Sequence, residues 1–182
     1  MPAKFEIKAS TYIYAVLLLL AIPLQWLFAW ILAATVHEFC HWFAVRLCGG
    51  EVYSVTVGIG GAEMKCSPMT GTKRLIAVLC GPIGGAIPVL FARWIPQTAL
   101  CCCFLSAYNL LPLLHLDGGK IAAILFGKKA VFVELVFLII LSIGAVFLSL
   151  GMDFGIMPIA ISVILWLRSR NNPCKANVCK VQ

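Results

Sequence analysis

The chain has 182 residues, of which 62% are apolar and only 12% are charged, and fourteen Lys and Arg against seven Asp and Glu give a net charge of +7. A soluble domain typically carries about 25% charged and about 45–50% apolar residues. The composition therefore excludes an ordinary water-soluble enzyme and a disordered chain. It also excludes a nucleic-acid-binding domain, because the chain has no basic stripe interleaved with aromatic residues.

Six apolar runs predict an all-α polytopic membrane protein with about six transmembrane helices. The runs cover residues 10–22, 24–47, 75–92, 98–116, 130–150 and 154–167. As one helix, the first two would be about 55 Å long, against roughly 30 Å of hydrocarbon. We expect the helix to break at Pro23. Because the first and last runs are short, five spans are the alternative.

The distribution of basic residues predicts that both termini are cytoplasmic. With six spans, Arg93 alone falls on the side opposite the termini. This is a strong positive-inside signal. No small-x-small cleavage site follows Ile22, so we interpret the first run as a retained span rather than a signal peptide. The basic residues on the terminal side are Lys4, Lys8, Arg46, Lys65, Lys73, Arg74, Lys120, Lys128, Lys129, Arg168, Arg170, Lys175 and Lys180.

The segments outside the apolar runs are too short to fold independently. The longest covers residues 48–74 and is followed in length by a tail at 168–182. Chains below about 40 residues usually need outside support. We therefore expect one membrane domain over residues 1–182, with a core at 10–126 and two further spans at 130–167.

The loop after the second run contains a β-strand pattern. Residues 51–57 alternate and are rich in β-branched side chains, and the glycine-rich segment 58–61 follows as a turn. We predict a strand or hairpin at the membrane face. The glycine cluster lacks the Lys-Ser/Thr ending of a phosphate-binding loop, so a turn is the better interpretation.

Ionisable residues within the apolar runs are few, and three of them form an H-E-x-x-H pattern. An ionisable group at mid-bilayer costs about 2.5–3.5 kcal/mol, so each needs a reason. His37 and His41 are four residues apart, which lets both imidazoles bind one ion from a helix. Glu38 then lies beside the metal and can act as a general base. The alternative is that the three side chains only make hydrogen bonds between helices.

A catalytic zinc needs a third protein ligand and an open position. Asp117, in the run Leu116-Asp117-Gly118-Gly119-Lys120, is the candidate. Its alternative role is the N-cap of a helix that begins near Gly118. His115 is two residues away and on a different helical face, so we expect one of the two to bind metal rather than both.

Two further polar residues lie in apolar surroundings. Pro112 removes a backbone donor, so we expect the helix to open near Asn109. The Asn109 amide either holds a substrate carbonyl or developing oxyanion, or satisfies carbonyls that Pro112 frees. For Glu134, near the start of the fifth run, an interfacial position offers an explanation without function.

Three segments together resemble the site-2 protease family of intramembrane zinc metalloproteases: His37-Glu38-Phe39-Cys40-His41, Cys80-Gly81-Pro82 and residues 109–120. The resemblance implies that His37, His41 and Asp117 bind one Zn²⁺ and that Glu38 is the base. It implies a membrane-tethered substrate, such as a sigma or transcription factor precursor, cut in or near its transmembrane segment in the bacterial cell membrane.

The six-span layout is most similar to the branch that includes stage IV sporulation protein FB, and the short loops exclude the branch with periplasmic PDZ modules. Two positions depart from the family pattern. His115 stands where proline is common, and Gly84-Gly85 replaces a larger polar residue.

Two structural expectations concern access to the site. The small residues Gly81, Gly84 and Gly85 predict a thin third span with a cavity beside it. The strand at 52–57 is expected to pair with the unwound substrate by edge addition.

Cysteine spacing suggests neither disulfides nor a second zinc site. Five cysteines lie in apolar runs, where they behave as small apolar residues. The other four fall on the predicted cytoplasmic side and form no C-x-x-C pair. These four are Cys48, Cys66, Cys174 and Cys179.

The alternative function is a non-proteolytic membrane protein that binds or transports a divalent metal. A transporter favours a second polar pathway on the opposite side, where the sequence offers only Arg93, Gln97 and Asp153. Retention of Glu38 favours catalysis, because a pure binding site has no need of a base. A catalytically inactive scaffold is the third interpretation, and the intact constellation disfavours it.

Overall fold

The computed structural model describes residues 4–7, 9–58, 61–151 and 155–170. The chain divides into two compact units, Met1–Asn109 and Leu110–Gln182. The expectation of a single membrane domain stays a prediction.

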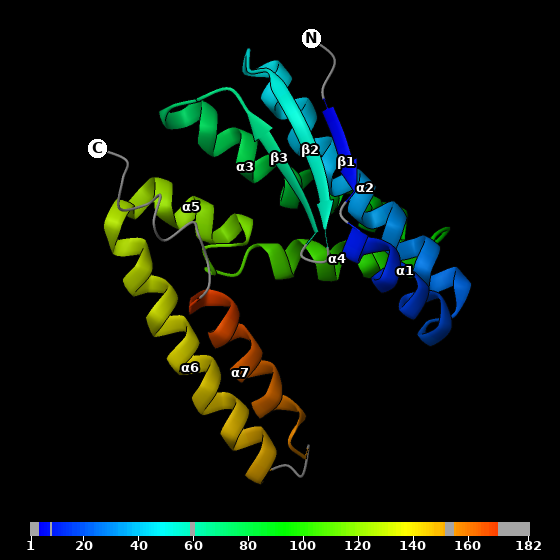
Figure 1. Ribbon diagram of the computed structural model, residues 1–182, viewed down its shortest axis with the longest axis vertical. Helices are drawn as coiled ribbons and strands as arrows, with labels where there is room; N and C mark the ends of the chain where they lie inside the picture. Colours follow the sequence, from blue (N-terminus) through cyan, green and yellow to red (C-terminus); the bar gives the residue numbers. More distant parts are fainter. Residues whose placement is uncertain (1–3, 8, 59–60, 152–154, 171–182) are drawn as a thin grey trace. The chain divides into compact units, whose positions relative to one another are not determined.

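The first unit is built mainly from helices (Figure 1). Pro23 separates the first two helices and occupies the N-cap of the second with extended backbone angles, which confirms the predicted break. Pro82 lies inside the third helix without ending it. The helical elements are α1 (Ala9–Ala21), α2 (Leu24–Leu47), α3 (Gly71–Gly85), the short 3-10 helix η1 (Ile87–Phe91) and α4 (Pro96–Asn109).

The first unit also contains a three-stranded sheet in the order β1-β2-β3 (Figure 1). Strands β2 (Val52–Gly58) and β3 (Gly61–Cys66) form an antiparallel hairpin, which confirms the predicted hairpin, while residues 59–60 of its turn lie outside the described residues. Strand β1 (Lys4–Ile7) pairs in parallel with β2 and was not predicted.

The position of β2 corrects one expectation. Because β2 is the central strand, its two edges already pair with β1 and β3. Edge addition of a substrate to residues 52–57 is therefore wrong for this arrangement. The outer edges of the sheet belong to β1 and β3.

The second unit consists of α5 (Asp117–Phe126), the short 3-10 helix η2 (Gly127–Lys129), α6 (Ala130–Gly151) and α7 (Met157–Arg170). Helices α6 and α7 lie side by side as a hairpin (Figure 1). Ser142 on α6 lies 2.9 Å from the Ser162 hydroxyl on α7 and accepts a 2.9 Å hydrogen bond from the Trp166 indole. Polar side chains thus join the two helices.

Within the described residues, three stretches are long and apolar enough to cross a membrane: Leu24–Leu47, Gly71–Phe91 and Asp117–Leu150. Helices α1, α4 and α7 have 13, 14 and 14 residues, which is short of the roughly 20 that a span usually needs. The predicted count of about six spans is therefore not confirmed.

Two predicted boundaries are corrected. Helix α4 ends at Asn109, so the run at 98–116 overestimated its length. This end confirms that the helix opens near Asn109, ahead of Pro112. The apolar stretch of the second unit begins at Asp117 rather than at Ala130, because α5 precedes α6.

Much apolar surface remains exposed along these helices. On α6, for example, Ile140, Ile143 and Phe147 are 62%, 66% and 67% exposed. A soluble protein rarely exposes such continuous apolar surface. Such a surface is suited to contact with lipid acyl chains.

Candidate metal centre

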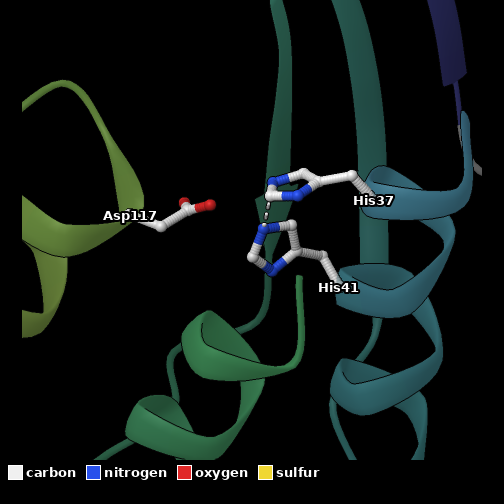
Figure 2. A group of neighbouring side chains, drawn as sticks. All are labelled: His37, His41 and Asp117. Carbon is white, nitrogen blue, oxygen red and sulfur yellow. Dashed lines mark hydrogen bonds between the residues drawn. The ribbon is translucent and has the colours of Figure 1, made fainter. Parts of the chain in front are cut away.

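His37 and His41 lie one turn apart on α2 and form a close pair (Figure 2). Their Nε2 atoms are 3.2 Å apart and their rings are nearly perpendicular. Two nitrogens that each lie about 2.0–2.1 Å from a tetrahedral zinc are roughly 3.3 Å apart. The separation of the two Nε2 atoms therefore fits a pair of zinc ligands.

The orientation of His41 is fixed by helix α3. Its Nδ1 atom lies 2.8 Å from the carbonyl oxygen of Ala77. A carbonyl only accepts hydrogen bonds, so Nδ1 carries the proton and donates it. In the neutral ring, Nε2 then has the lone pair that a metal needs.

Glycines on α3 make room for the histidine motif. A Cβ at Gly81 would collide with the His41 ring, and a Cβ at Gly84 would collide with the Cys40 sulfur. The space that Gly81 and Gly84 leave is thus filled by α2, and a cavity elsewhere beside the third span stays a prediction. The proximity of α3 to α2 holds His41 in place.

Gly85 borders His37 in a similar way. The position of a Cβ there is 3.2 Å from His37 Nδ1 and 3.3 Å from the Ser106 hydroxyl. His37 is 3% exposed and Ser106 is 6% exposed. His37 is therefore enclosed by α3 and α4.

Glu38 follows His37 directly on α2 and is partly exposed. The protein thus carries a carboxylate on the same helix turn as the histidine pair. A carboxylate near a metal can take a proton from water.

Asp117 is the first residue of α5 in the second unit and is 3% exposed. Its Oδ1 atom accepts a 2.9 Å hydrogen bond from the Lys120 ammonium in an ion pair. The N-cap of α5 is Leu116, so the alternative role of Asp117 as the N-cap is wrong. His37, His41 and Asp117, drawn in Figure 2, can each offer one ligand atom to a metal.

The glycines after Asp117 allow a close backbone approach. A Cβ at Gly118 would collide with the Leu110 carbonyl, and one at Gly119 would collide with the Leu113 carbonyl. The start of α5 is thereby packed directly against the chain that precedes it.

His115 is partly buried in the second unit. Among the described residues, neither of its ring nitrogens has a hydrogen-bond partner. Burial lowers the pKa of His115 to about 4, with a further decrease from the charges of Arg168 and Lys120 and an opposing increase from Glu134.

Asn109 is the last residue of α4, and its amide nitrogen donates a 3.0 Å hydrogen bond to the Leu105 carbonyl. This bond lies within the helix and does not reach the carbonyl that Pro112 frees, which belongs to Tyr108. A role for Asn109 toward substrate stays a prediction.

Glu134 is packed inside the protein and does not extend toward solvent as a snorkelled interfacial side chain would, which corrects that expectation. The residue is 1% exposed, and its Oε1 atom accepts a 3.1 Å hydrogen bond from the Leu114 N–H. The signal in the sequence was an acid inside a 22-residue helix that is otherwise apolar or uncharged.

Comparison with known proteins gives a partial similarity. No family model matches the chain. It is 37% identical over 59 residues to the regulator of sigma-E protease RseP of Escherichia coli K12, and equally to the protease RseP of Yersinia pestis and the regulator of sigma E protease of Salmonella typhi. The match covers 32% of this chain and 13% of each relative.

The similarity to RseP supports the resemblance to the site-2 protease family and gives no support to the branch of stage IV sporulation protein FB. With the three long apolar helices, it also supports an integral membrane protein.

Proposed function

We propose that this protein is an intramembrane zinc metalloendopeptidase that cuts a membrane-tethered protein in or near its transmembrane segment. The observation that carries the proposal is the histidine pair of α2. The two Nε2 atoms are 3.2 Å apart, and Ala77 orients His41 so that its Nε2 can bind metal. A base at Glu38 and the partial similarity to RseP favour hydrolysis over metal storage.

We propose His37, His41 and Asp117 as the ligands of one Zn²⁺. Two imidazoles and a carboxylate are a common ligand set of catalytic zinc and leave one coordination position open. Ligand chemistry also favours zinc over magnesium or calcium, which prefer oxygen donors.

In the proposed reaction, bound zinc supplies the Lewis acidity that makes water a nucleophile at neutral pH. Glu38 accepts a proton from the attacking water and passes it to the nitrogen of the departing peptide. Asn109 is proposed to donate a hydrogen bond to the scissile carbonyl, where negative charge develops.

We propose that the outer edge of β3 receives the substrate backbone. A transmembrane helix must unwind before it is cut, and its freed backbone groups need partners that lipid does not supply. Strand addition provides such partners. Strand β3 is longer than β1, with six residues against four.

The remaining features of the proposal come from sequence. They are a multi-pass arrangement of about six spans, both termini in the cytoplasm and a bacterial cell membrane location. The branch of stage IV sporulation protein FB stays our proposal from this layout alone.

The test is cleavage of tagged single-span substrates in membranes that also contain this protein. We expect cleavage by the wild type and by Glu51→Gln, an exposed glutamate outside the site. Glu38→Gln should give no product while its zinc content stays equal to that of the wild type. Cleavage by Glu38→Gln would contradict the proposal, and bound metal without any Glu38-dependent product would favour metal handling.

A further inference from the structure

Glu134 is an acid buried inside an apolar helix, and the proposed catalytic machinery does not use it. It lies in the first turns of α6 and is 1% exposed. Burying an ionisable group is costly unless it is hydrogen-bonded. Its contacts should therefore show what it does.

The Glu134 carboxylate binds the backbone of the segment that leads into α5. Its Oε1 atom accepts a 3.1 Å hydrogen bond from the N–H of Leu114, a residue that is itself 2% exposed. We call residues 110–116 the ligand loop, because they directly precede Asp117. A hydrogen bond to a carboxylate is stronger than one between neutral groups.

The ligand loop is held by turns rather than by a regular helix. The Leu113 N–H donates to the Leu111 carbonyl at 2.8 Å, and the Leu116 N–H donates to the Leu113 carbonyl at 2.7 Å. A buried backbone N–H in such a loop needs a partner from elsewhere in the fold. For Leu114, that partner is Glu134.

Packing connects the same residues. The Leu114 side chain lies in an apolar cluster with Ala122 of α5 and Ala130 of α6. Gly118 and Gly119 bring the start of α5 against the carbonyls of the ligand loop. A shift of Leu114 would therefore move the backbone that carries Asp117.

We propose that Glu134 is a positioning residue for Asp117: by holding the Leu114 N–H, it fixes the ligand loop and thereby the direction of the Asp117 carboxylate. The inference rests on the proposed zinc site and adds a residue to it. Groups that hydrogen-bond a metal ligand directly commonly affect affinity by about 10–100-fold, and we take this range as the upper limit for Glu134, which acts on Asp117 through the Leu114 backbone.

The test measures zinc affinity by chelator competition on the purified full-length protein, for the wild type, Glu134→Ala, Glu134→Gln and Glu134→Asp. Gln keeps an acceptor at the same distance, whereas Asp keeps the charge but is too short to reach Leu114. We expect the affinity to fall by about tenfold, and by at most about 100-fold, in Glu134→Ala and Glu134→Asp. Glu134→Gln should stay within about threefold of the wild type, since it retains the hydrogen bond.

Ser142→Ala is the matched control. It removes hydrogen bonds between α6 and α7 and leaves the ligand loop untouched. Its zinc affinity should equal that of the wild type, even if its melting temperature falls. If Glu134→Ala does not fold, Glu134→Asp decides the question.

Two results would overturn the inference: wild-type affinity in a folded Glu134→Ala or Glu134→Asp, or equal losses in Glu134→Gln and Glu134→Ala. Asp117→Asn in the same titration separates the two proposals. If the wild type binds zinc and Asp117→Asn weakens it while the Glu134 variants do not, only this inference fails. If the wild type binds no zinc, or Asp117→Asn has no effect, the proposed site itself fails.

Discussion

The Nδ1 atom of His41 donates a hydrogen bond to the carbonyl oxygen of Ala77, 2.8 Å away on the neighbouring helix. This contact joins α2, which carries the proposed metal ligands, to α3 and selects the ring tautomer whose Nε2 faces His37. It depends on how closely α3 approaches, which the glycines of α3 permit.

The first prediction tests this approach. Gly81→Ala places a Cβ against the His41 ring. We expect zinc affinity to fall about 10–100-fold because the ligand is displaced, with a loss of about 1–3 kcal/mol of stability from overpacking. Gly144→Ala is the control, because open space surrounds Gly144 on α6. It should be neutral or stabilise the helix by up to about 1 kcal/mol. Normal zinc binding by Gly81→Ala would show that the close approach is not needed.

The second prediction distinguishes the proposed zinc ligands His37 and His41 from the proposed general base Glu38. His37→Ala and His41→Ala should each lose zinc, measured as metal content after gel filtration. Glu38→Gln should retain zinc and lose about 10²-fold or more in cleavage rate, as expected when a general base is removed. Loss of zinc from Glu38→Gln would instead make Glu38 a ligand.

The third prediction concerns the start of α5. Gly118→Ala and Gly119→Ala each drive a Cβ into a carbonyl of the ligand loop. Because backbone cannot move aside as a flexible side chain does, we expect each to destabilise the protein by about 1–3 kcal/mol. Thermal unfolding measures this, with Gly144→Ala as the comparison. An unchanged melting temperature would mean that the loop does not pack as tightly as described.

The fourth prediction concerns the outer edge of β3. Neighbouring residues of a strand direct their N–H groups to opposite sides. Of Glu63→Pro and Met64→Pro, one therefore disrupts the hairpin with β2 and the other removes a donor from the outer edge. We expect the variant that keeps wild-type stability and zinc content to lose cleavage. Normal cleavage by that variant would contradict the proposal that the substrate backbone pairs with β3.

Local features of the fold were predictable from sequence. Pro23 predicted the break between the first two helices. The alternating pattern of residues 51–57, followed by a glycine-rich turn, predicted the hairpin. The end of α4 near Asn109 also followed from Pro112. Each of these depends on neighbours in the chain.

Contacts between distant segments were not predictable. Strand β1 has only four residues, too few for a periodic signal, and pairs with β2 about fifty residues later. Because β1 is present, β2 is the central strand, and a substrate strand cannot add to an edge of β2.

The polar contact of Glu134 was not predicted, because it too joins residues that are distant in sequence. The apolar run around Glu134 signalled that an acid there needs a partner, but that partner, the Leu114 N–H, lies twenty residues away in the chain and could not be identified from sequence. The histidine motif and Asp117 were identified because residue type and spacing alone carry their chemistry. Whether they bind one ion together stays a prediction.

The most direct test of the proposed zinc site is X-ray absorption at the zinc edge of the purified full-length protein. We predict one zinc per chain with only nitrogen and oxygen neighbours at about 2.0–2.1 Å and scattering from two imidazoles. In Asp117→Asn, the oxygen contribution should decrease while both imidazoles remain. A sulfur shell at about 2.3 Å, or no imidazole scattering, would assign the zinc to other residues and contradict the proposed site.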